Sequence, residues 1–180
     1  MLSDAWIRTY CGPAPGPDDF WFRWNFDPLL LAALSLLFFV VLRARSCHGL
    51  AAVGVLVLAF VSPLCALSSA LFSARVVHHV LLFAVAAPLL ARAWPSRRAG
   101  GAMAAFAVST VVLWGWHLPV AYDLALSHVG VYWLMQISLL GSALWFWRTV
   151  FAPGRTPVEA LTLLIAGFAQ MGLLGAILTF

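Results

Sequence analysis

Histidines at the ends of apolar segments are the residues of this sequence whose type and spacing could do chemistry. The chain has five histidines, and His78, His79 and His117 each border a long apolar run. Polar groups beside or inside such runs are costly to bury and suggest a function. An imidazole there could bind a transition metal, ligate haem iron, or hydrogen-bond to a neighbouring helix. Residue type alone leaves these three interpretations open.

The elements that must position these histidines are membrane-spanning helices. The chain is 64% hydrophobic and 9% charged, whereas soluble domains carry about 25% charged residues. Several uncharged runs approach the roughly 20 residues that cross a bilayer, and they are continuous rather than alternating, which argues against a barrel. We predict an all-α integral membrane protein, a single bundle (residues 28–180) of about six transmembrane helices with short connectors. The predicted helices are 28–42, 49–67, 76–93, 101–120, 130–150 and 158–180, preceded by an outer-side interfacial tail at residues 1–27.

The distribution of charge predicts the orientation of this bundle. The tail and the connectors after the second and fourth helices hold five of the six acidic residues but only three arginines. Arginine accumulates in cytoplasmic loops. Both termini are therefore predicted on the outer, periplasmic side of a bacterial inner membrane. The other connectors carry the remaining seven arginines: Arg43, Arg45, Arg92, Arg97, Arg98, Arg148 and Arg155. Tryptophans near the predicted helix ends are interpreted as interfacial anchors.

The predicted topology brings several polar side chains to one depth. At 1.5 Å per residue, His79 and His117 lie roughly 6 Å below the outer surface and Gln136 roughly 9 Å below it. Because consecutive helices pack antiparallel, His79, His117 and possibly Gln136 meet at one level. His78 and Cys65, near the same level, are candidate auxiliary ligands, since a thiolate favours Cu(I).

Two charged residues could support such a site. Arg75 stands one turn before the histidine pair and is either a snorkelling interfacial arginine or a cation that keeps the imidazoles neutral and able to bind metal. Asp123 follows the Pro119 connector and is either a solvated acid or an acceptor that orients an imidazole. These roles, like those of the histidines, are hypotheses from position alone.

At these histidines the sequence resembles the CtaG-type polytopic cytochrome c oxidase assembly proteins. The resemblance is carried by FRWNFDPLLL, SPLCALSSALFSARVVHHVLL, APLLARAWP, WGWHLPVAYDLAL, SALWFWR and LLGAILTF. Its most specific part is the His-x-Pro followed by Tyr-Asp, together with a histidine-containing helix that ends in Pro-Leu-Leu. The resemblance implies a helical inner-membrane protein that helps to mature haem-copper oxidases and handles copper at the outer face. Its implied partners are oxidase subunits or other assembly factors, besides the lipid bilayer.

The sequence departs from the family pattern at the start of the third predicted helix. Where relatives read like His-Met-x-x-His-Met, this chain has Arg75 at the first histidine, His79 at the second and valines at both methionines. A frequent histidine of the fifth helix corresponds to Gln136, and relatives usually continue beyond the position of Phe180. The complete methionine and histidine site therefore does not carry over, and a reduced site is expected.

The sequence favours an accessory factor over an enzyme. It has no phosphate-binding glycine loop, paired carboxylates or Ser/His/Asp constellation, and its arginines are not clustered for nucleic acid. The main hypothesis is an oxidase assembly factor that binds Cu(I) through His79 and His117, with His78 and Cys65 as auxiliary ligands. One alternative is a haem-binding electron carrier with His79 and His117 as axial ligands. The other is a structural oxidase subunit that binds no ligand of its own.

Overall fold

The part of the chain that the structure describes is helical. The computed structural model places residues 9–13, 15–96 and 101–179, and no strand occurs among them. The prediction of an all-α fold is confirmed for these residues. In chain order the elements are η2 (Phe20–Phe22), α1 (Pro28–Arg43), α2 (Cys47–Phe60), α3 (Leu64–Ala70), α4 (Phe72–Val80), η3 (Leu81–Ala86), α5 (Ala87–Ala93), α6 (Ala102–Trp116), α7 (Pro119–Ser127), α8 (Val129–Val150) and α9 (Pro157–Thr179).

Among the described residues, three helices are long and apolar enough to cross a membrane, or up to five if each bent pair counts as one span. The three are Phe72–Ala93, which joins α4, η3 and α5, then Val129–Val150 and Pro157–Leu178. The bent pairs are α2 with α3, at 49°, and α6 with α7, at 73°. Helix α1, with 16 residues, is shorter than a span. A membrane bundle is thus supported, and the count of six spans stays a prediction.

Prolines set the two bends. Helix α2 ends at Phe60, three residues before Pro63, whose ring would clash with a helical carbonyl of the preceding turn. Leu118 has extended backbone because it precedes Pro119, and Pro119 starts α7 as its first residue. The predicted continuous helix at residues 101–120 is therefore wrong at its end, and His117 caps α6 at the corner.

A proline also shapes the span that carries the histidine pair. Residues Leu81–Ala86 form a π-helical segment, η3, immediately before Pro88 in α5. In π-helical pairing Pro88 would donate to the carbonyl five residues back, that of Phe83, but proline has no N–H. The indole Nε1–H of Trp147 donates to that carbonyl instead, at 2.6 Å. Trp147 is 7% exposed, so its interpretation as an interfacial anchor is wrong.

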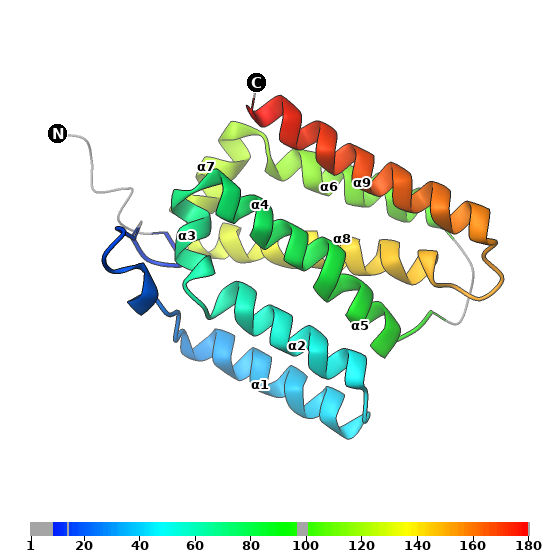
Figure 1. Ribbon diagram of the computed structural model, residues 1–180, viewed down its shortest axis with the longest axis horizontal. Helices are drawn as coiled ribbons and strands as arrows, with labels where there is room; N and C mark the ends of the chain where they lie inside the picture. The colour runs from blue at the N-terminus through cyan, green and yellow to red at the C-terminus, as the bar shows by residue number, and fades with distance from the viewer. Residues whose placement is uncertain (1–8, 14, 97–100, 180) are drawn as a thin grey trace.

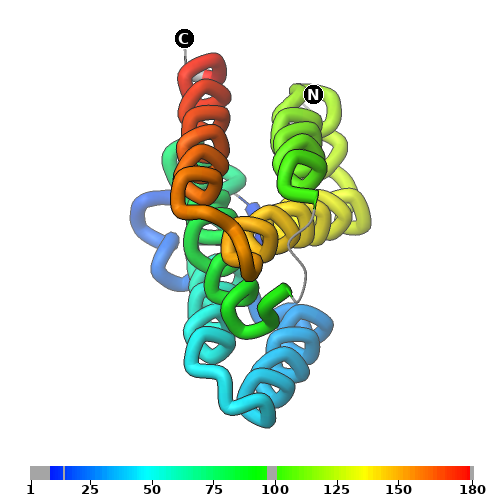
Figure 2. The backbone as a smooth tube through the Cα atoms, turned by 90° about the vertical axis from the view of Figure 1, so that its right-hand side faces the viewer, coloured from blue at the N-terminus to red at the C-terminus, as the bar shows by residue number. Residues whose placement is uncertain are grey.

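Helix α8 runs through the middle of the bundle (Figure 1). It contacts η3, α5, α6, α7 and α9, while α1 packs on α2. Viewed along the other direction, α6 and α9 stand on one side of α8, and α1 and α2 on the opposite side (Figure 2). The core beside the π-helical segment joins Phe83, Phe146 and Trp147. Gly167 of α9 lies against Phe146, and a Cβ atom there would come within 3.2 Å of the Phe146 ring.

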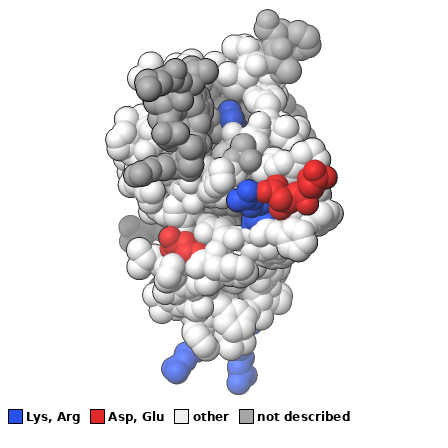
Figure 3. All heavy atoms as spheres, turned by 90° about the vertical axis from the view of Figure 1, so that its left-hand side faces the viewer, with Lys and Arg blue, Asp and Glu red and all other residues white. Residues whose placement is uncertain are grey.

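Charged residues lie at both ends of the bundle. Helices α1, α5 and α8 end at the same end of the bundle at which α9 begins (Figure 1). The last turns of α1, α5 and α8 carry Arg43, Arg92 and Arg148. The other end carries α3, α7 and the N-terminal segment. Figure 3 looks onto that end and shows acidic side chains beside basic ones. Among the residues of the N-terminal segment, Asp19 and Arg23 form an ion pair. Arg97 and Arg98 lie outside the described residues.

The N-terminal segment is anchored to this end of the bundle. The Asn25 backbone N–H donates to the Val61 carbonyl at 2.9 Å, and its side-chain amide donates to Phe60 at 3.2 Å. Asp27 then caps α1 by accepting from the Leu30 N–H at 2.9 Å. The described part of the predicted tail is thus docked on the corner between α2 and α3, next to the histidines.

Candidate metal site

His79 and His117 meet in the structure, as the equal-depth argument predicted. Their ring centroids are 5.1 Å apart, and the rings stand at 73° to each other. His79 comes from α4 and His117 from the corner between α6 and α7. Because α4 begins at Phe72 rather than at the predicted residue 76, His79 lies about 10 Å along its span instead of 6 Å.

The hydrogen bond of His117 fixes which of its nitrogens can bind a metal. Nδ1 lies 2.7 Å from the Leu113 carbonyl oxygen. A carbonyl only accepts, so Nδ1 carries the proton and Nε2 keeps its lone pair. A carbonyl behind an imidazole is a common arrangement in metal sites, where it sets the tautomer and the ring orientation. The predicted acceptor, Asp123, is exposed on α7, and no hydrogen bond among the described residues joins it to an imidazole.

Both imidazoles line a cavity of about 310 Å³ between α4, α6 and α9. Its polar groups come from His79, His117 and Arg75, while the rest of its wall is mostly apolar. Gly172 and Gly175 of α9 border it, and a Cβ atom at Gly172 would meet nothing within 4 Å. These two glycines therefore leave room beside the histidines.

Arg75 is held in place beside this cavity. Its guanidinium lies over the Tyr122 ring, 4.1 Å from the centroid, and its Nε donates to the Ser68 carbonyl at 3.3 Å. A cation on an aromatic face and a carbonyl acceptor fix the side chain more firmly than snorkelling would. Arg75 therefore adds a fixed positive charge next to the histidine pair.

His78 points in a different direction from His79. It is 1% exposed, packs against Phe60 with ring centroids 5.1 Å apart, and does not line the larger cavity. Its polar neighbour is Gln136 of α8, yet neither ring nitrogen of His78 nor Oε1 of Gln136 makes a hydrogen bond of good geometry. The structure thus pairs Gln136 with His78 inside the bundle, and not with His117.

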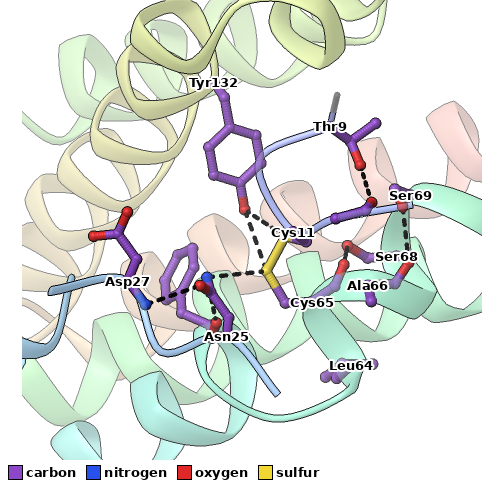
Figure 4. Close-up of a disulfide and its surroundings, with 12 residues drawn as sticks. Thr9, Cys11, Asn25, Asp27, Leu64, Cys65, Ala66, Ser68, Ser69 and Tyr132 are labelled. Atoms are coloured by element: carbon purple, nitrogen blue, oxygen red, sulfur yellow. Dashed lines mark hydrogen bonds between the residues drawn. A yellow bond between two sulfur atoms is a disulfide. The ribbon is translucent and has the colours of Figure 1, made fainter. Parts of the chain in front are cut away.

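Cys65 is not a free thiol. It forms a disulfide with Cys11, with the two Cα atoms 5.5 Å apart, so its predicted role as a thiolate ligand is wrong in this state of the protein. The Tyr132 hydroxyl lies 3.6 Å from the Cys11 sulfur and 3.9 Å from the Cys65 sulfur (Figure 4). The predicted topology already contained a signal for this disulfide. Cys11 and Cys65 were both predicted on the outer side, where thiols oxidise, whereas Cys47, which is free, was predicted on the cytoplasmic side.

The fold and the site together define a helical membrane protein with a histidine pair near one end of its bundle. Residues 97–180 match the family model described as the cytochrome c oxidase caa3 assembly factor, Caa3_CtaG. The resemblance recognised in the sequence is thereby confirmed for residues 97–180. The matched segment contains His117 and α6 to α9, whereas His79 precedes it. No match was found among curated proteins or among solved structures.

Proposed function

We propose that this protein is an assembly factor of a cytochrome c oxidase that holds copper near the outer face of the inner membrane, without catalysing a reaction. The observation that carries the proposal is the contact between His79 and His117. Their rings lie 5.1 Å apart, come from different helices and border the same cavity. The match of residues 97–180 to an oxidase assembly family supports the cellular role. When bound, copper would be the cargo of the site.

The donor set fits copper better than structural zinc. Among the described residues, no group of three or more histidine, cysteine, aspartate or glutamate side chains converges. Structural zinc sites use four such ligands, whereas imidazole and soft sulfur ligands also suit copper. His117 would bind through Nε2, because its Nδ1–H is engaged by Leu113. The apolar wall of the cavity would limit access of water to the ion.

The haem alternative finds less support in this geometry. Two axial histidines stand on opposite faces of a porphyrin, with the iron about 2 Å from each ligating nitrogen and the macrocycle between the rings. Here the two rings touch each other edge to face at 5.1 Å. A porphyrin would have to separate α4 from α6, whereas a single ion needs only a small adjustment of the side chains.

The disulfide supports the proposed orientation independently of the arginines. Disulfides persist in oxidising compartments such as the periplasm and are rare in the cytoplasm. Cys11 and Cys65 lie at the end of the bundle that is poor in arginine, and the free Cys47 follows Arg43 and Arg45 at the other end. Both signals support the proposal that the histidine pair lies near the periplasm, where oxidase subunits or other assembly factors would receive copper.

Cu(I) binding tests the proposal directly. The protein is purified in detergent, loaded with Cu(I) without oxygen, and titrated with a colorimetric Cu(I) chelator. We expect about one Cu(I) per chain, with strong losses in His79→Ala and in His117→Ala. The exposed His128 at the same end provides the matched control, so His128→Ala should bind as the parent protein does. Binding that survives the His79→Ala/His117→Ala double substitution would overturn the site, and no binding by the parent would favour a structural subunit.

A further inference from the structure

We propose that Met171 of α9 supplies a third ligand to the histidine pair, so that two imidazoles and one thioether form a Cu(I) site. This inference rests on the proposed function and makes it more specific. It assigns to α9 a role that neither the sequence motifs nor the family match gives it. The site would be built by three helices: α4 through His79, the end of α6 through His117, and α9 through Met171.

Met171 borders His79 in two cavities. It lines the cavity of about 310 Å³ together with both histidines. It also lines a smaller cavity of about 20 Å³, between the helices, in which His79 again takes part. The Met171 side chain is half-buried and packs against the core around Phe146. Met171 therefore lines the same two cavities as His79, and an unbranched side chain with three rotatable bonds can adjust to an ion there.

His79 and Met171 also lie at similar depth along their helices. His79 is seven residues after the start of α4 at Phe72, which gives about 10 Å along the axis. Met171 is eight residues before the end of α9 at Thr179, which gives about 12 Å. Helix α9 runs antiparallel to α8 and ends at the same end of the bundle as α3 and α7 (Figure 1). The thioether therefore faces the histidine level rather than the Arg-rich end.

The other methionines do not share this position. Met103 is 74% exposed in the first turn of α6, at the opposite end of that helix from His117. Met135 of α8 is buried, and it lines a small cavity together with His78, His79 and Gln136, but His117 does not line that cavity. Neither of them borders the cavity of the histidine pair. Met1 lies outside the described residues.

The chemistry of this donor set selects Cu(I). A thioether is a soft, neutral ligand that favours Cu(I) over harder divalent ions, and imidazole accepts both. None of the three ligands is anionic, and the fixed guanidinium of Arg75 borders the same cavity. Coulomb repulsion from Arg75 acts twice as strongly on a divalent ion as on a monovalent one. The site would thus hold a monovalent soft ion and discriminate against zinc.

X-ray absorption of the copper-loaded protein tests this assignment. The copper edge and its fine structure should show two nitrogen scatterers and one sulfur scatterer in the parent protein. Met171→Leu, which conserves volume, should lose the sulfur scatterer and bind Cu(I) at least about tenfold more weakly, as expected when a metal-site residue is removed. Zn²⁺ binding should change little. Met103→Leu is the matched control and should leave the spectrum and the affinity unchanged.

The outcomes separate this inference from the proposed function. Copper bound with nitrogen ligands alone, and with equal affinity in the parent and Met171→Leu proteins, would overturn the role of Met171 while leaving the histidine site standing. A sulfur scatterer that persists in Met171→Leu but disappears in Met135→Leu would overturn it as well. Absence of Cu(I) from the parent protein would overturn the proposed function itself. Elution of each variant at the parent's volume in detergent excludes misfolding as the cause.

Discussion

The indole of Trp147 stabilises the π-helical segment of the span that carries His79. Trp147→Phe removes the Nε1–H that donates to the Phe83 carbonyl at 2.6 Å. That buried carbonyl then has no donor, since Pro88 cannot provide one. An unpaired buried polar group costs about 1–3 kcal/mol, while hydrogen bonds between membrane helices average about 0.6 kcal/mol with a maximum of about 1.7. We expect the free energy of unfolding to fall by about 1–2 kcal/mol.

The assay is reversible unfolding of the detergent-solubilised protein by SDS titration, followed by circular dichroism. Trp145→Phe on the same helix is the matched control, because Trp145 is 43% exposed and its loss should cost little. In a Pro88→Ala background the backbone regains an N–H at this position, so Trp147→Phe should cost less there. An equal loss of stability in the two backgrounds would refute the link between Trp147 and the proline.

Three further predictions follow from other parts of the fold. A membrane-impermeant thiol reagent applied to intact cells should not label Cys47, and should label the Cys11–Cys65 pair only after mild reduction; labelling of Cys47 from outside would reverse the orientation. Gly167→Ala should lower the free energy of unfolding, because the added Cβ would lie 3.2 Å from the Phe146 ring, whereas Gly172→Ala meets open space; equal thermal stability of the two variants would contradict this packing. Protein from haem-replete cells should be colourless, and a stoichiometric Soret band that depends on the histidine pair would favour the haem alternative.

The pairing of His79 with His117 could be predicted because it depends on regular geometry. A helical rise of 1.5 Å per residue and an antiparallel connection are enough to bring two residues of neighbouring spans to one level. The error in the depth of His79 arose at the helix boundary, where Phe72 and Ser73 continue the helix although the apolar run begins later. The two rings are nevertheless in contact, with centroids 5.1 Å apart.

Features that depend on irregular backbone or on the path of the tail could not be predicted in this way. The position of Cys11 is set by tertiary contacts of the tail, such as the stacking of Tyr10 on Tyr132 with centroids 4.8 Å apart, and periodicity carries no signal for them. The role of Trp147 follows from a π-helical segment, which shifts the hydrogen-bond partner of Pro88 by one residue. The corner at His117 could be predicted from the sequence, because Pro119 disfavours helical backbone at the residue before it, Leu118.

The placement of these irregularities argues that the histidine pair is more than a contact that joins helices. In hydrocarbon, a broken helix leaves backbone groups without partners, so such backbone is tolerated where it is buried in protein or lines a cavity. The 73° corner holds His117 itself, and the π-helical segment begins two residues after His79. A contact between two straight helices would need neither feature. Helices bent around a cavity that two imidazoles border leave room for the small cation proposed above, and the repulsion by Arg75 favours a low charge on that cation.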